Sequence, residues 1–159
     1  MFKAILVLVL AALLFLPSVA ETAAPTAAYA QVQAAVKAYI EAANRADVAA
    51  MMRMVSRKAG VVSITDGAIE RGWDTIRLTN DQIVGKEGSY KMSIGSIDVL
   101  MLSANVAVAV TPFTFTVASD QGSIQVPGAV SIVFERSGGR WLVVHEHESV
   151  QTRDMAIGD

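Results

Sequence analysis

Four long, apolar-rich runs separated by short turns fill the C-terminal half of this 159-residue chain. The runs are residues 90–102, 104–117, 124–136 and 140–151. Strands of this length that are joined by short turns pair antiparallel with their neighbours. Gly95, Pro112 and Gly128 interrupt the runs and are expected to mark bulges or bends, because proline cannot donate to a strand ladder and glycine bends it. The pattern predicts a curved antiparallel sheet, whose hollow side has to be covered by other elements.

Three helical patterns in the N-terminal half can supply that cover. Apolar residues recur at helical spacing over residues 26–44, and Asp47 is a suitable N-cap for a shorter second helix. A third amphipathic pattern begins at Trp73. Between the second and third patterns, two apolar runs flank Asp66-Gly67, a dipeptide typical of a tight β-hairpin turn. This order of elements indicates an α+β domain with its helices on one side of a bent sheet.

The N-terminus has the features of a secretory signal peptide. Lys3 precedes an unbroken apolar run over residues 4–16, which is 13 residues long (16 − 4 + 1) and shorter than the ~20 residues that span a bilayer as a helix. Small residues occupy the −3 and −1 positions of a cleavage site after Ala20. We predict a periplasmic or secreted protein, with a retained membrane anchor as the alternative. The expected organisation is a cleaved signal peptide at 1–20, a flexible lead-in at 21–28, a folded domain at 29–152 and a C-terminal tail at 153–159.

The charge balance and the lack of cysteine exclude several kinds of partner and chemistry. The chain carries 13 basic and 15 acidic side chains, a formal charge of −2, whereas nucleic-acid binding needs a basic face. Without cysteine the chain can form neither a disulfide framework nor a thiolate nucleophile. No glycine-rich phosphate loop is present in the sequence. We therefore predict no nucleic-acid partner, no membrane association after signal cleavage, and no cofactor.

Three segments give the chain a resemblance to a known family. They are residues 44–47 (NRAD), 72–77 (GWDTIR) and 139–149 (GRWLVVHEHES). With these motifs, residues 29–152 resemble the nuclear transport factor 2-like superfamily, and more narrowly its SnoaL-like branch. The resemblance implies a cone-shaped α+β fold: a strongly bent antiparallel sheet with three helices covering its concave face, a pocket between the two, and a homodimer formed through the outer face of the sheet. The superfamily includes isomerases, cyclases, dehydratases and kinase association modules, so the fold alone does not fix the function.

The last predicted strand holds the most conspicuous polar cluster. Strand alternation places His145, His147 and Ser149 on one face and Glu146 and Glu148 on the other, and a register shift of one residue would exchange them. His147 could serve as an acid–base group in the pocket, because imidazole titrates near neutrality. Two imidazoles two residues apart could also chelate a metal, but the chain has no further histidine and we predict no metal site. A purely structural histidine, hydrogen-bonded to a neighbour, is the third interpretation.

Asp98, the pair Trp73 and Arg77, and the aromatic residues can each have either a structural or a functional role. Asp98 interrupts an apolar strand, where it could act as a general base with a raised pKa, point outward, or form an ion pair with Arg77. Trp73 and Arg77 are four residues apart and can face the sheet together, so Arg77 could bind a carboxylate ligand or pair with Glu70 or Asp98. Aromatic residues such as Tyr39 are ordinary core, the lining of an apolar cavity, or both.

The interpretation we favour is an exported SnoaL-like domain that binds a small, largely apolar molecule between sheet and helices, as a homodimer. The ligand-binding residues it predicts are Tyr39, Trp73, Arg77, Phe113, His145 and Ser149. The first alternative is a cofactor-free isomerase, dehydratase or hydrolase, with His147 and Asp98 as the catalytic residues. The second is a homo-oligomeric association module without catalysis.

Overall fold

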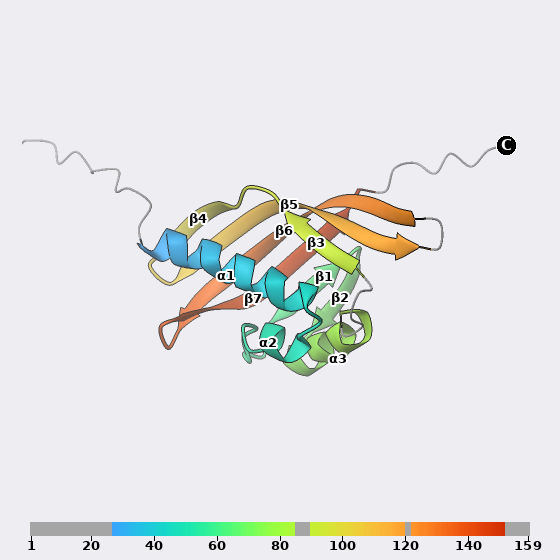
Figure 1. The fold of residues 1–159 in the computed structure, drawn as a ribbon. Coiled ribbons are helices and arrows are strands. Elements are labelled where there is room, and N and C mark those ends of the chain that lie inside the picture. The colour runs from blue at the N-terminus through green and yellow to red at the C-terminus, as the bar shows by residue number, and fades with distance from the viewer. Residues whose placement is uncertain (1–26, 85–89, 120–121, 152–159) are drawn as a thin grey trace, which may run out of the picture.

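The computed structural model describes residues 27–84, 90–119 and 122–151 (Figure 1). It contains three helices, all at the positions predicted from apolar periodicity: α1 (Ala27–Asn44), α2 (Val48–Met52) and α3 (Trp73–Ile83). The predicted signal peptide and C-terminal tail, and nearly all of the lead-in, lie outside the described residues. Among the described helices, none has the length and apolar character needed to span a membrane.

Seven strands form one bent sheet with the order β2-β1-β7-β6-β5-β3, and β4 also pairs with β5. The strands are β1 (Val62–Thr65), β2 (Ala68–Arg71), β3 (Tyr90–Ile94), β4 (Asp98–Ser103), β5 (Val106–Ser119), β6 (Gly122–Ser137) and β7 (Arg140–Val150). All pairs are antiparallel except β1 and β7, which run parallel. The sheet is therefore mixed, not wholly antiparallel as expected, because β1 and β7 are far apart in the chain and no short turn dictates their relative direction.

The run predicted as one strand over residues 90–102 is divided into two. β3 and β4 both pair with β5, and the chain bends between them at Gly95, whose N–H donates to the Pro112 carbonyl oxygen at 2.9 Å. The side-chain amide of Gln33 on α1 donates to the Ile97 carbonyl oxygen in the same bend at 3.0 Å. The bend expected at Gly95 and Pro112 is thus real, and it is held against the first helix.

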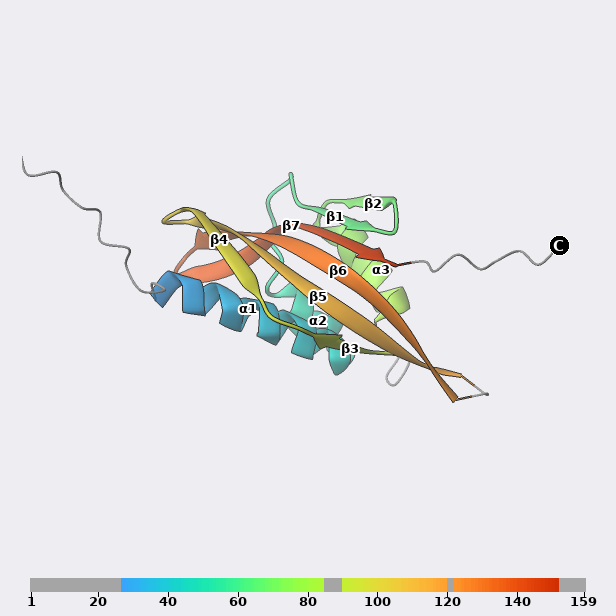
Figure 2. The same cartoon turned by 90° about the horizontal axis from the view of Figure 1, so that it is seen from above.

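The helices cover the concave face of the sheet unevenly. Figure 2 shows α1 running along one face of the twisted sheet, where it packs on β3, β4, β5 and β7. The shorter helices α2 and α3 lie at one end, where α3 contacts β1 and β2. The core between the layers includes Val36, Tyr39, Met52, Ile132 and Phe134, which are all fully buried. The cone-shaped α+β fold is confirmed.

The second helix is shorter than its sequence pattern predicts, because the apolar pattern continues to Val55 and Gly60 is the expected terminator. Asp47 caps it as predicted, because its Oδ1 accepts the Ala50 N–H at 2.8 Å. The helix ends at Met52 because the next segment joins the sheet: the Ser56 N–H donates to the Val143 carbonyl oxygen at 2.8 Å, and the Val143 N–H donates to the Met54 carbonyl oxygen at 2.8 Å. The segment that follows α2 is therefore an additional neighbour of β7.

Candidate functional site

A β-bulge in β7 decides which of its side chains face the helices. Val143 pairs with Phe134 of β6, and both are buried in the core. The next pair joins His145 to Val133, so Val144 is an extra residue without a partner on β6. One extra residue moves every following side chain of a strand to the opposite face.

For this reason the histidines do not lie on the same face of β7 as its buried core residues Trp141 and Val143. Beyond the bulge, Glu146 and Glu148 face the helices and line the pocket. His145 is half-buried on the opposite face of the sheet, and His147 and Ser149 are exposed there. The bulge therefore brings two carboxyl groups, in place of two imidazoles, to the concave side.

The pocket lies between the concave face of the sheet and all three helices, and its volume is about 290 Å³. Most of its wall is apolar and comes from the three helices, from the residue that follows α3, and from β3, β5, β6 and β7. These apolar residues are Tyr39, Ile40, Ala43, Met51, Ile76, Ile83, Val84, Met92, Phe115, Val117, Val126 and Val150. Among the described residues that line it, none is Lys, Arg or His. The pocket thus joins an apolar body to a purely acidic set of ionisable groups.

Strand pairing gathers these acidic groups at one end of the pocket. Ser63 of β1 pairs with Glu70 of β2 on one side and with Glu146 of β7 on the other, which places both carboxyls in one row across the sheet. Thr65 pairs with Glu148 two residues further on. Asp66 follows at the hairpin turn, where its Oδ1 accepts the Val150 N–H at 3.1 Å.

Burial and mutual repulsion raise the pKa of each of the two central carboxyl groups, Glu146 and Glu148. Desolvation is the main cause that raises the pKa of Glu146, and the nearby Glu70 charge adds to it, whereas the hydrogen bond donated by the Tyr39 hydroxyl at 2.8 Å opposes the rise. Burial likewise raises the pKa of Glu148 to about 8, with further contributions from the charges of Glu146 and Asp66. At neutral pH Glu148 is therefore mostly a neutral carboxylic acid.

This arrangement can donate and accept hydrogen bonds inside an apolar enclosure. A protonated Glu148 can donate to a carbonyl or amine of a bound molecule, or transfer its proton to it. Glu146, oriented by Tyr39, is an acceptor beside it. Within the described residues, no group of three or more His, Asp or Glu has the arrangement needed to hold a metal ion.

The structure brings one of the predicted ligand-binding residues into this pocket. Tyr39 lines it, whereas Phe113 is buried in the core against Phe115, with 4.6 Å between ring centroids. Trp73 and Arg77 line a different hollow. Arg77 pairs with Asp81 on its own helix at 3.4 Å. The sequence suggests Glu70 or Asp98 as its partner, and the structure shows neither pair.

The predicted catalytic pair is not assembled at the pocket. Asp98 is exposed at the start of β4, paired across the sheet with the exposed Val110. His147 is exposed on the same, outer face of the sheet. Neither residue is among those that line the pocket.

The residues that the sequence failed to single out are Glu146 and Glu148. Between His145 and Ser149 both faces of β7 are polar, so hydrophobic alternation cannot decide which face is buried. The sequence signal for an inward-facing Glu146 and Glu148 is the period of two along a strand. Because of that period, a single extra residue exchanges the face of the histidines with the face of the glutamates.

The fold places the chain in a wide class of similar structures. A nuclear transport factor 2-like protein from Shewanella oneidensis MR-1 is 24% identical, with a TM-score of 0.62 over 76% of this chain and 97% of that one. A candidate dehydratase of the same family from Streptomyces avermitilis is 15% identical, with a TM-score of 0.72 over 82% of this chain and 100% of the other. The association domain of C. elegans CaMKII is 16% identical, with a TM-score of 0.66 over 77% and 90%. The chain therefore has the fold of the nuclear transport factor 2-like proteins.

The sequence identifies the family to which the chain belongs among proteins with this fold. The family model of the SnoaL-like domain matches residues 32–153, which is more than half of the chain. The chain therefore belongs to the SnoaL-like domain family. The comparison with curated proteins gives no match.

Proposed function

We propose that this SnoaL-like domain binds a small, largely apolar molecule in the pocket that Glu146 and Glu148 line. The observation that carries the proposal is an apolar cavity of about 290 Å³ whose ionisable lining is entirely acidic. Ligand sites are typically concave, mostly apolar and equipped with a few polar groups that fix orientation. A cavity and one or two polar anchors are sufficient for binding, and both are present here.

The carboxyl groups select the polar end of the ligand. An anionic group would meet the four acidic residues Asp66, Glu70, Glu146 and Glu148 without a compensating cation in the lining. A carbonyl, ether or amine can accept a hydrogen bond from the protonated Glu148. The proposed ligand is therefore an apolar molecule with a neutral acceptor or a basic group at one end.

Blocking the pocket tests this proposal. We expect the neutral fluorescent probe N-phenyl-1-naphthylamine to bind the wild-type protein with saturable fluorescence enhancement. Thr79→Phe, which places a ring in the lining of the pocket from α3, should weaken that binding at least tenfold. Thr75→Phe is the matched control, because Thr75 lies one turn earlier on the same helix, is exposed and does not line the pocket. Equal binding by both variants would contradict the proposed site.

We further propose export and homodimer formation through the outer face of the sheet. This face exposes Leu100 (62%) and Val110 (41%) beside the half-buried Val108, and exposed apolar patches are common at protein interfaces. Native mass spectrometry of the protein from its own host should show a chain that begins at Glu21, present as a dimer. A monomer with an intact N-terminus would contradict both parts.

The interface within that proposal is tested by charge insertion. Val110→Glu should shift the dimer to a monomer in light scattering, because a carboxylate buried there would lie opposite Asp98, which carries the same charge, and would have no partner. Leu78→Glu is the control, since Leu78 is 60% exposed on α3, away from the sheet. Dissociation by the control alone would place the interface elsewhere.

A further inference from the structure

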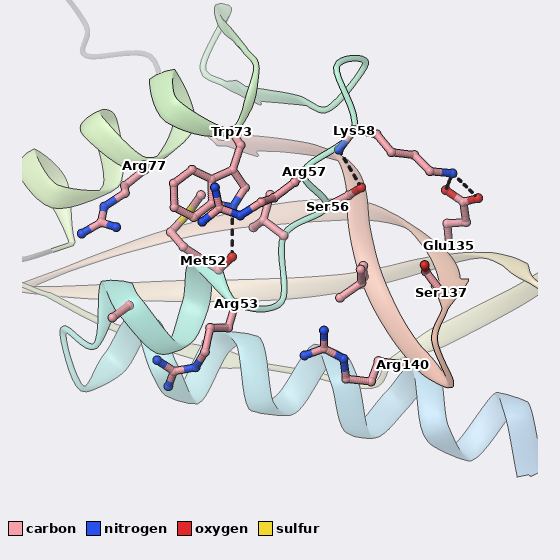
Figure 3. A pocket seen from close by; sticks show the side chains of 13 residues that line it. Met52, Arg53, Ser56, Arg57, Lys58, Trp73, Arg77, Glu135, Ser137 and Arg140 are labelled. Atoms are coloured by element: carbon pink, nitrogen blue, oxygen red, sulfur yellow. Dashed lines mark hydrogen bonds and ion pairs between the residues drawn. The ribbon is translucent and has the colours of Figure 1, made fainter.

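A second hollow lies on the other side of α2 and α3 from the pocket that Glu146 and Glu148 line, which we call the carboxyl pocket. The volume of the second hollow is about 730 Å³ (Figure 3). The segment after α2, the start of α3, the end of β6 and the start of β7 form its walls. Of the described residues that line the two cavities, none is shared. The second hollow is therefore a separate feature of the fold.

The charge of this hollow is opposite to that of the chain. Figure 3 shows basic side chains arranged around it, and they are Arg53, Arg57, Lys58, Arg77 and Arg140. The acidic residue in the lining is Glu135. Both of its carboxylate oxygens accept hydrogen bonds from the Lys58 ammonium, each at 2.6 Å. A net positive lining is unexpected in a protein with a formal charge of −2, because charges mixed at random over its surface would not separate in this way.

An aromatic side chain gives the hollow a fixed wall. The Trp73 indole N–H donates to the Met52 carbonyl oxygen at 3.1 Å, which holds the ring in place. The Arg57 guanidinium carbon lies 3.6 Å from the ring centroid, and that of Arg77 lies at 5.6 Å. A guanidinium that stacks on an aromatic face keeps the N–H groups at its edge available for bidentate hydrogen bonds.

Three of the guanidinium groups have no anionic partner in the part of the chain that the structure describes. Within residues 27–84, 90–119 and 122–151, no carboxylate oxygen lies within 4.0 Å of a guanidinium nitrogen of Arg53, Arg57 or Arg140. Like charges gathered around one concave surface repel one another, and an anion between them relieves that repulsion. Arginine is also the side chain whose planar fork best fits phosphate and carboxylate groups.

We propose that this hollow binds a small molecule that carries two or more phosphate or carboxylate groups, with Arg53, Arg57 and Arg140 as the hydrogen-bond donors. One anionic group fits the edge of the Arg57 guanidinium on its Trp73 support. Arg53 and Arg140 bind a second group across the hollow. The concave shape favours a compact polyanion over an extended polymer, and the site is independent of the ligand proposed for the carboxyl pocket.

Titration with inorganic pyrophosphate and with citrate tests the proposal. At low salt we expect saturable binding of at least one of them by calorimetry, together with a change in tryptophan fluorescence. The double variant Arg53→Gln/Arg140→Gln should weaken binding at least tenfold, and added NaCl should weaken binding to the wild type. Arg136→Gln is the matched control, because Arg136 is exposed on β6, close in sequence to Glu135, and does not line the hollow.

The outcomes separate this site from its alternatives. Arg53 and Arg140 are exposed and make no ion pair with any residue that the structure describes, so the double variant should unfold at the same temperature as the wild type. Absence of saturable binding, or equal loss in the Arg136 control, would overturn the proposal. Binding of heparin without binding of pyrophosphate or citrate would also overturn it, in favour of a surface for an anionic polymer.

Discussion

Gly128→Ala is expected to lower the free energy of unfolding by about 3 kcal/mol or more, since overpacking a tight core costs roughly 1–3 kcal/mol and here one obstacle is backbone. Gly128 of β6 pairs with Phe113 of β5 and Val150 of β7, in the centre of the sheet. A Cβ at this position would overlap Cζ of Phe113, lie 2.7 Å from its Cε2, and lie 2.5 Å from the Ser149 carbonyl oxygen. The ring cannot retreat, because it is buried against Phe115. Urea unfolding at a fixed pH measures the loss.

A matched glycine and a compensating change make this prediction specific. Gly60→Ala should change the free energy of unfolding by less than about 0.5 kcal/mol, because a Cβ there meets nothing within 4 Å. Phe113→Leu should recover part of the loss when combined with Gly128→Ala, since it removes the ring but leaves the Ser149 oxygen in place. If Gly128→Ala is as stable as the Gly60 variant, the close approach of Phe113 to β6 is not present in solution.

Most of the fold follows from local sequence signals. Asp47 begins the second helix, Asp66-Gly67 turns the first hairpin, and the interruptions at Gly95 and Pro112 coincide with the bend between β3 and β4. Each signal acts over a few residues, through a cap, a turn conformation or a missing donor. Patterns of this kind are visible in a single sequence.

The features that build the pocket depend on contacts between distant segments. The parallel pairing of β1 with β7 joins Ser63 to Glu146, residues that no local pattern connects. The bulge at Val144 lies where the neighbour of β7 changes from the segment after α2 to β1, as the bonds of Val143 to Met54 and Ser56 show. Sequence alternation therefore identifies the strand but leaves its inward face open, because that face depends on a register that tertiary contacts determine.

The pH dependence of stability should report the state of the pocket directly. The pKa of Glu148 is about 8 in the folded protein against 4.5 for an ordinary glutamate. Between these values the unfolded chain has lost the proton that the folded chain keeps, so unfolding releases a proton and becomes easier as pH rises. The stabilisation is complete below pH 4.5 and is lost as pH approaches 8. The raised pKa of Glu146 acts in the same direction.

Glu148→Gln should remove the part of this dependence that comes from Glu148, because a neutral amide of similar shape replaces a carboxyl that burial disfavours as an anion. The full shift corresponds to about 5 kcal/mol at 1.36 kcal/mol per pKa unit, and partial solvent access reduces the expected gain to about 2 kcal/mol at pH 9. The variant and the wild type should be nearly equal in stability at pH 5. Urea unfolding at pH 5, 7 and 9 measures the slopes, with Glu41→Gln on the exposed surface of α1 as the control. A wild-type slope that Glu148→Gln leaves unchanged would mean that the Glu148 carboxyl is hydrated and ionised, and the acidic end of the pocket would then select a cation instead of a neutral acceptor.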